Sequence, residues 1–134
     1  MQIIFIDDKH EQLYKEYYNR MKYFDEYHDA AAYLLSLDRV CREHTEDIFD
    51  FKGDAIRLQG LHQEWQTGTS AKTTRLLFNL WNGCYSDGHT YKDNKGYETE
   101  LPSRYFTVDE IFSCSYAPYY WQAIQLRYPD YAEA

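Results

Sequence analysis

Residues 61–83 decide how the chain folds, and they read Leu-His-Gln-Glu-Trp-Gln-Thr-Gly-Thr-Ser-Ala-Lys-Thr-Thr-Arg-Leu-Leu-Phe-Asn-Leu-Trp-Asn-Gly. Apolar residues recur there at the spacing of one helix face, namely Leu76, Leu77, Leu80 and Trp81. Thr69 or Ser70 is placed to cap the start of this helix, and Gly83 stands where a left-handed residue ends many helices. The stretch therefore predicts a helix over residues 70–82 at the centre of the fold.

Further helices are predicted on both sides of this stretch. Asp8 opens one, after an apolar leader or short strand at residues 1–6. Three alanines at residues 30–32 favour a second helix and permit close approach of a neighbour. The last helix covers residues 118–128 and is expected to pack against the central one. Its predicted shared face consists of Tyr120, Trp121, Ile124 and Tyr128.

Residues 84–106 form the loosest part of the chain, a loop or hairpin insert. Asp87-Gly88 and Asn94-Lys95-Gly96 are turn signals, and Thr90-Tyr91 can pair with Tyr97-Glu98-Thr99. A small β-hairpin is therefore expected near residues 89–99. Taken together, the patterns predict a mainly α fold, a compact single domain over residues 1–134 that is a bundle of about six helices.

Composition and charge limit the classes of partner. The net charge is −8, and 15 of the 134 residues are tyrosine. Residues 1–64 hold 14 acidic and 8 basic side chains, a net charge of −6. An acidic surface repels nucleic-acid phosphates, so direct binding to DNA or RNA is not expected. Tyrosine suits half-buried positions and contact surfaces, which favours a protein partner.

Cysteine usage and hydropathy bear on location. The three cysteines, Cys41, Cys84 and Cys114, are odd in number and widely spaced, which argues against a disulfide framework and for a reducing cytoplasm. The first residues lack the features of a signal peptide, and no apolar stretch approaches the length of a membrane span. We therefore expect a cytoplasmic protein without a membrane partner.

Three familiar kinds of chemical site are only partly matched. Residues 68–73 resemble a phosphate-binding loop but lack its glycines and its preceding strand. Cys41-x2-His44 with Cys84-x4-His89 offers zinc-ligand types at loose spacing, and burial explains Cys41 equally well. Cys114 has no histidine at a spacing typical of a nucleophile and its base. We therefore assign no catalytic residue, no metal ligand and no cofactor from the sequence.

Two groups of residues remain as candidate binding sites. The first borders the tryptophans of residues 61–83 and consists of Trp65, Gln66, Thr67, Arg75, Asn79 and Asn82. Within it, Asn79 is unfavourable inside a helix, so it should bond a loop backbone or contact a ligand. The second group is an acidic partner surface of Glu43, Glu46, Asp47 and Asp50. Solvation of an acidic flank is its simpler explanation.

Several stretches resemble a known group of proteins. Residues 47–52 (Asp-Ile-Phe-Asp-Phe-Lys), 65–70 with 75–83, and 112–120 with 126–129 are similar to an uncharacterised family of short proteins from Gram-positive bacteria, their phages and mobile elements. The resemblance covers roughly residues 10–131, and residues 85–104 are longer than that family suggests. It implies a phage or mobile-element setting, and it transfers no activity and no catalytic residue.

Three functional hypotheses follow. The first is a non-enzymatic, acidic protein-interaction factor, a phage or mobile-element inhibitor that binds a host or defence protein through a basic groove of that protein. The alternative is a small-molecule or nucleotide-binding protein, with enzymatic activity left open, that uses residues 65–82. The third is a homo-oligomeric accessory protein whose tyrosines face a second copy of the chain.

Overall fold

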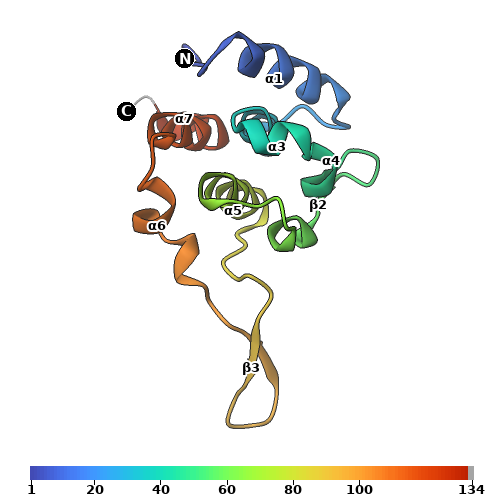
Figure 1. The fold of residues 1–134 in the computed structure, drawn as a ribbon, viewed down its shortest axis with the longest axis vertical. Coiled ribbons are helices and arrows are strands. Elements are labelled where there is room, and N and C mark those ends of the chain that lie inside the picture. The colour runs from blue at the N-terminus through green and yellow to red at the C-terminus, as the bar shows by residue number, and fades with distance from the viewer. Residues whose placement is uncertain (133–134) are drawn as a thin grey trace.

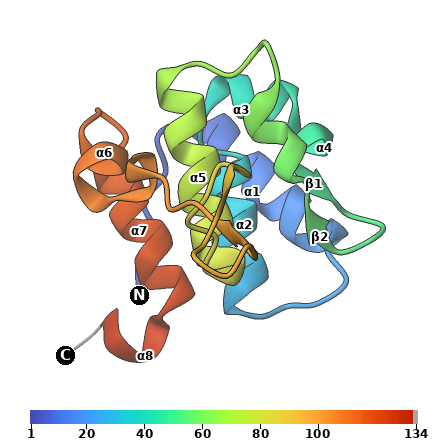
Figure 2. The same ribbon diagram turned by 90° about the horizontal axis from the view of Figure 1, so that it is seen from below.

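Helix α2 (Glu26–Leu35) lies at the centre of the fold, in a computed structural model that describes residues 1–132. It packs against α1 (Asp8–Arg20), α5 (Gly68–Asn82) and α7 (Ala117–Arg127), as Figures 1 and 2 show. Every residue from 30 to 38 is buried. The alanines of α2 have no long side chains, so its neighbours can approach it closely.

Helix α2 shares the central position that was predicted for helix 70–82 alone, because α5 packs against α2, α7 and elements on its other side. Helix α5 is amphipathic and buries one face, with Leu76, Leu77 and Leu80 inside and Trp81 half-buried. A helix that is apolar on one side covers a core, whereas one that is apolar all round is enclosed by it. The apolar stripe of α5 is easier to recognise in the sequence, but a larger fraction of the residues of α2 is buried.

The remaining elements are short. In chain order they are α3 (Arg39–Glu43), α4 (Thr45–Ile48), β1 (Phe49–Asp50), β2 (Ala55–Ile56), η1 (Leu58–His62), β3 (Thr90–Lys92), β4 (Glu98–Glu100), η2 (Arg104–Phe106), α6 (Val108–Phe112) and α8 (Pro129–Ala132). The mainly α fold class is confirmed. The described residues 1–132 hold eight α-helices rather than about six, because helices of four or five residues carry no periodic apolar stripe.

Residues close in sequence set both ends of α5. Gly83 ends the helix in the left-handed region, with φ of 77°, as predicted. The start lies earlier than predicted, because Thr67 is the capping residue and Gly68 is already helical. The Thr67 N–H donates to the Ser70 hydroxyl at 2.8 Å, so Ser70 completes the cap from inside the first turn.

Helix α7 presents a different face from the predicted one. Tyr120, Ala123 and Leu126 are buried, whereas Trp121 is 58% exposed and Tyr128 is also exposed. The Tyr120 hydroxyl lies 2.6 Å from the hydroxyl of Thr73 and joins α7 to α5. Most of the contact surface of α7 is against α2, which turns the helix away from the face that its own sequence suggests.

The leader docks on the body in an extended conformation. The Ile4 N–H donates to Oε1 of Gln122 on α7 at 3.0 Å, and the Ile4 carbonyl accepts from the Tyr33 hydroxyl at 2.7 Å. Ile3 and Phe5 pack against the core. The N-terminus therefore lies beside α7, far from the β3–β4 hairpin that projects at the bottom of Figure 1.

Candidate functional site

Strands β3 and β4 form a hairpin that projects from the helical body (Figure 1). The strands are antiparallel, with Tyr91 opposite Thr99 and Lys92 opposite Glu98. The pairing continues toward the body, because the Leu101 N–H donates to the His89 carbonyl and the Ser103 N–H to the Tyr85 carbonyl, each at 2.8 Å. The predicted hairpin is confirmed, one residue further along than expected in its second strand.

The two faces of this hairpin differ in chemistry. Opposite residues in an antiparallel pair point to the same face, and successive residues alternate. One face carries Thr90, Lys92, Glu98 and Glu100. The other, called here the aromatic face, carries Tyr91, Tyr97, Thr99 and Leu101, with His89 opposite Leu101 and Asp93 opposite Tyr97. Its three apolar members are exposed, Tyr91 by 47%, Tyr97 by 68% and Leu101 by 46%.

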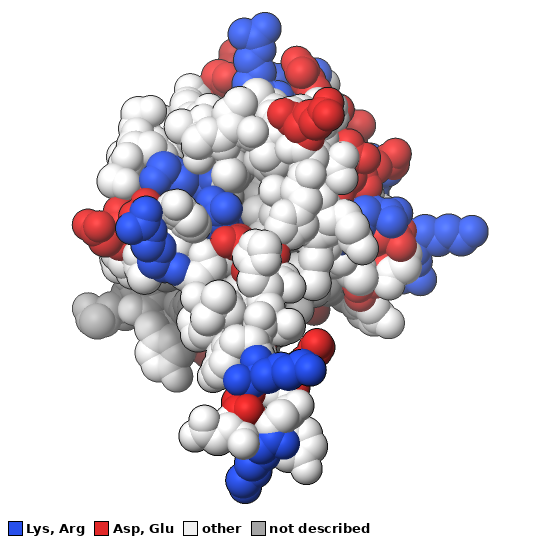
Figure 3. Space-filling model, turned by 60° about the horizontal axis from the view of Figure 1, so that its bottom comes forward, with Lys and Arg blue, Asp and Glu red and all other residues white. Residues whose placement is uncertain are grey.

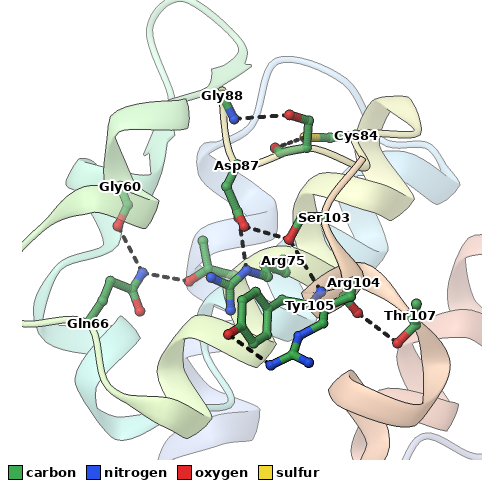
Figure 4. Close-up of polar contacts among 12 residues, drawn as sticks. Gly60, Gln66, Arg75, Cys84, Asp87, Gly88, Ser103, Arg104, Tyr105 and Thr107 are labelled. Atoms are coloured by element: carbon green, nitrogen blue, oxygen red, sulfur yellow. Dashed lines mark hydrogen bonds and ion pairs between the residues drawn. The ribbon is translucent and has the colours of Figure 1, made fainter. Parts of the chain in front are cut away.

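A polar network anchors the base of the hairpin to α5, as Figure 4 shows. The Arg75 Nε–H donates to Asp87 at 3.1 Å, and the Ser103 hydroxyl donates to the second oxygen of the same carboxylate at 2.6 Å. Both side chains of the ion pair are mostly buried. The Arg75 guanidinium also lies 5.0 Å from the ring centre of Tyr105. The hairpin therefore leaves the body in a fixed direction.

A cleft of about 520 Å³ lies beside this network. Its walls are η1, the first turns of α5, η2 and α6. Three of the predicted residues, Gln66, Thr67 and Arg75, line it, together with Leu61, His62, Gln63, Gly68, Ala71, Lys72, Tyr105 and Glu110. The structure thus brings half of the first candidate group into one site.

Gln66 has a structural role in this cleft. Its amide N–H groups donate to the Gly60 carbonyl at 2.9 Å and to the Thr74 hydroxyl at 3.0 Å. Its carbonyl oxygen accepts from the Ser70 hydroxyl at 2.8 Å. These bonds join η1 to α5 and fix one wall of the cleft.

The other members of the first group lie elsewhere. Trp65 stacks on the ring of His44 at 4.2 Å, and its buried indole N–H has no hydrogen-bond partner within residues 1–132. Asn79 donates to the Cys84 carbonyl at 3.0 Å, and Asn82 accepts from the Cys84 N–H at 3.1 Å. Both asparagines bond the loop that follows α5, which is the structural alternative foreseen for Asn79.

The acidic group is interleaved with cations. Glu46 pairs with Arg20 at 3.0 Å, and Asp50 lies 3.6 Å from Arg57. Asp47 lies 3.3 Å from the His44 ring. Glu43 is exposed. The pairs with Arg20 and Arg57 make this surface less negative than its four acidic residues suggest. Acidic and basic side chains are mixed along one edge of the body in Figure 3.

Two buried histidines have pKa values that are shifted in opposite directions. His28 donates from both ring nitrogens, to Asp25 and to Asp54, at 2.6 Å each, which requires the protonated ring. Burial disfavours that charge, but the bonds to the two carboxylates outweigh it and raise the pKa of His28. His10 accepts from the Ile6 N–H and donates to the Tyr33 carbonyl, and burial lowers its pKa to about 4.

The zinc alternative finds no geometric support in the part of the chain that the structure describes. Residues 1–132 contain no group of three or more histidine, cysteine, aspartate or glutamate side chains arranged to hold a metal ion. The Cys41 thiol is buried against the Ser70 carbonyl and Thr74, and burial raises its pKa.

Across residues 1–132, no helix combines the length and the apolar character needed to cross a bilayer.

Sequence reasoning missed Lys72, Asp87, Ser103 and Tyr105 as parts of the site. The local sequence marks Asp87 only as a turn residue, and it marks Lys72 only through the partial resemblance of residues 68–73 to a phosphate-binding loop. Nothing in the local sequence sets Ser103 or Tyr105 apart. Comparison with known proteins adds a family. A family model described as a family of unknown function, DUF6075, matches residues 1–134. The chain belongs to this family.

Membership in the DUF6075 family agrees with the uncharacterised family expected from the sequence. The comparison with curated proteins found no match. No solved structure matched the fold.

Proposed function

We propose that this DUF6075 protein is a non-enzymatic factor that binds another protein through the aromatic face of its hairpin. The observation that supports it is the exposure of Tyr91, Tyr97 and Leu101 on a hairpin that projects from the body. An isolated two-stranded hairpin is marginally stable, and packing of one face normally stabilises it. Here a partner surface would supply that packing.

The chemistry of the face fits a protein partner. Tyrosine is enriched at protein interfaces because its ring buries apolar area while its hydroxyl keeps a hydrogen-bond partner. The opposite face, with Lys92 and Glu98, is charged and suits solvent. A two-faced hairpin whose apolar side chains are exposed is the arrangement expected of a docking element.

The acidic group is the weaker candidate for this contact. Arg20 and Arg57 already pair with two of its carboxylates, so a basic groove would have to displace them. Exposed pairs of this kind contribute little stability, which leaves such displacement feasible but gives no reason to prefer it. We therefore propose that the aromatic face makes the contact. The proposed partner is a host or defence protein, bound by a factor that a phage or mobile element encodes.

Paired double variants test the proposal. Tyr91→Ser with Tyr97→Ser removes the aromatic face, and Lys92→Ser with Glu98→Ser makes a matched change on the charged face. We expect the tagged wild-type protein and the charged-face variant to retain one partner from the native cell extract, and the aromatic variant to lose it by more than about tenfold, or about 1.4 kcal/mol.

Sedimentation velocity of the three purified proteins decides whether the partner is a second copy of the chain. A wild-type dimer that only the aromatic variant dissociates would identify the hairpin as a homo-oligomer contact. Equal retention of the partner by both double variants would contradict the proposal.

A further inference from the structure

Two cations and one acidic residue line the cleft beside the hairpin base, on a protein whose net charge is −8. Lys72 and Arg75 line it one turn apart on α5. The Lys72 ammonium donates to the Glu110 carbonyl and to the Ser113 hydroxyl, the latter at 3.3 Å, and both acceptors are neutral. No ion pair joins Lys72 to a carboxylate within residues 1–132, so its charge remains available to a ligand.

Arg75 is positioned by one edge of its guanidinium. Its Nε–H bonds to Asp87, and the Tyr105 ring lies beneath the group. Asp87 is its one hydrogen-bond acceptor among the described residues, which leaves the N–H groups of the other edge for a second acceptor. An arginine held at one edge is suited to bind a planar or tetrahedral oxyanion at the other.

Gly68 keeps one wall of the cleft open. Its φ is not positive, so its backbone does not require glycine, and an added Cβ would have no atom within 4 Å. The fold therefore gives no reason for glycine at this position, whereas close approach of a ligand to the backbone does.

Glu110 limits what the cleft can accept. It lines the same cleft as Lys72 and Arg75, opposite α5 on helix α6. A second anionic group placed near it would be repelled, and a hydrogen-bond donor would be favoured. The cleft therefore suits a molecule with one anionic end and one donor-bearing end, and Leu61, Ala71 and the Tyr105 ring supply apolar lining.

We propose that this cleft binds a small organic molecule that carries a single phosphate or carboxylate group, which Lys72 and Arg75 hold. Its volume of about 520 Å³ lies within the range of about 300–1,000 Å³ that small-molecule sites occupy. It is much larger than one phosphate ion needs, so the rest of the ligand contributes to binding. This inference is independent of the hairpin contact.

Amide chemical shifts of the full chain test the cleft directly. Inorganic phosphate, adenosine monophosphate and benzoate are titrated separately, to distinguish the anion alone, a phosphate-bearing molecule and a carboxylate-bearing molecule. We expect saturable shifts at Gly68, Ala71, Lys72 and Tyr105 with at least one organic anion, and weaker shifts with inorganic phosphate. Absence of saturable shifts with all three up to about 10 mM, well above a millimolar Kd, overturns the proposal.

Three variants separate a built site from general attraction of anions. Lys72→Gln removes the ammonium, and Gly68→Ala places a methyl group in the open wall without removing any charge. Each should raise the Kd by at least about tenfold, or about 1.4 kcal/mol. Lys9→Gln makes the same charge change on α1 and should leave the Kd unchanged.

Gly68→Ala keeps the test informative if Lys72→Gln folds poorly, because alanine favours the helix and its Cβ meets no neighbour. A Kd that neither cleft variant changes, or that Lys9→Gln raises equally, shows non-specific binding and refutes the site. Arg75 is left intact because its replacement would also release the hairpin.

Discussion

Replacement of His28 by glutamine should destabilise the protein in a pH-dependent manner. The ring bridges Asp25, which caps α2, and Asp54, in the turn between β1 and β2. It therefore ties the start of the central helix to the first hairpin. The other groups against the ring are the uncharged rings of Tyr23 and Trp81.

The magnitude follows from the exposure of the three side chains. The His28 side chain is 6% exposed, Asp54 is 23% exposed and Asp25 is 39% exposed. A hydrogen bond to a charged group contributes about 1.5–3 kcal/mol. The bond to Asp25 is screened by solvent and is discounted to below about 1 kcal/mol. The expected loss of unfolding free energy is therefore about 1.5–4 kcal/mol below pH 6.5.

The sign of the pH dependence is set by the raised pKa of His28. A group whose pKa is raised in the folded state contributes its full stabilisation when the pH is below its pKa in the unfolded state, which is near 6.5 for histidine. This stabilisation is lost as the pH rises through the pKa of the folded state. For Asp25, burial acts in the opposite direction, but the bonds from His28 lower the pKa. Its contribution is complete above about pH 4 and is lost as the pH falls through the lowered value. The bridge is strongest between these limits.

Urea unfolding of wild-type protein and His28→Gln from pH 5 to pH 9 measures the effect. Their free-energy difference should be largest near pH 5–6 and should shrink as the pH rises. Asp54→Asn is the matched control for charge, because asparagine tolerates the positive φ of 55° at this position. Its stability difference should show the same trend. A difference between wild type and His28→Gln that stays constant from pH 5 to pH 9 would refute the bridged imidazolium.

Three further predictions concern the body and the hairpin. Trp81→Ala should lower the free energy of unfolding by about 2–4 kcal/mol, because the ring packs on His28 and Phe49. The control variant Trp121→Ala, at an exposed position, should change it by less than about 0.5 kcal/mol. Equal melting temperatures for the two variants would contradict this packing. Arg75→Ala removes the ion pair that anchors the hairpin, so it should speed amide hydrogen exchange at Tyr91 and Thr99 while the α2 amides stay protected. Unchanged exchange in the hairpin would show that Arg75 does not hold the hairpin in place. Gly83→Ala should cost about 1 kcal/mol in chemical denaturation because φ is 77°, and a stabilised variant would argue against the left-handed helix end.

The parts of the fold that the sequence predicts are those with local causes. The stripe of α5 and the left-handed Gly83 both depend on residues a few positions apart. The same holds for the β3–β4 hairpin, whose turn residues stand between its strands. Local spacing carries this information directly.

The parts that it does not predict depend on contacts between distant residues. The central position of α2 is set by three helices that pack around it, and the face of α7 by that same packing. Gln66 and Arg75 could be singled out as polar residues beside the tryptophans, but their partners could not. Arg75 meets Asp87 through a loop, and His28 meets Asp54 through the first hairpin. Such pairs have no spacing signature in a single sequence.

Arg75 belongs both to the wall of the cleft and to the base of the hairpin. An anion that pulls the Arg75 guanidinium away from Asp87 would loosen the hairpin. An anion that binds the guanidinium edge opposite Asp87 would hold the hairpin more firmly. Thermodynamic linkage requires the reverse effect as well, so a partner seated on the hairpin would change the affinity of the cleft by the same factor. The single ion pair between Arg75 and Asp87 would then transmit allosteric coupling between small-molecule and protein binding.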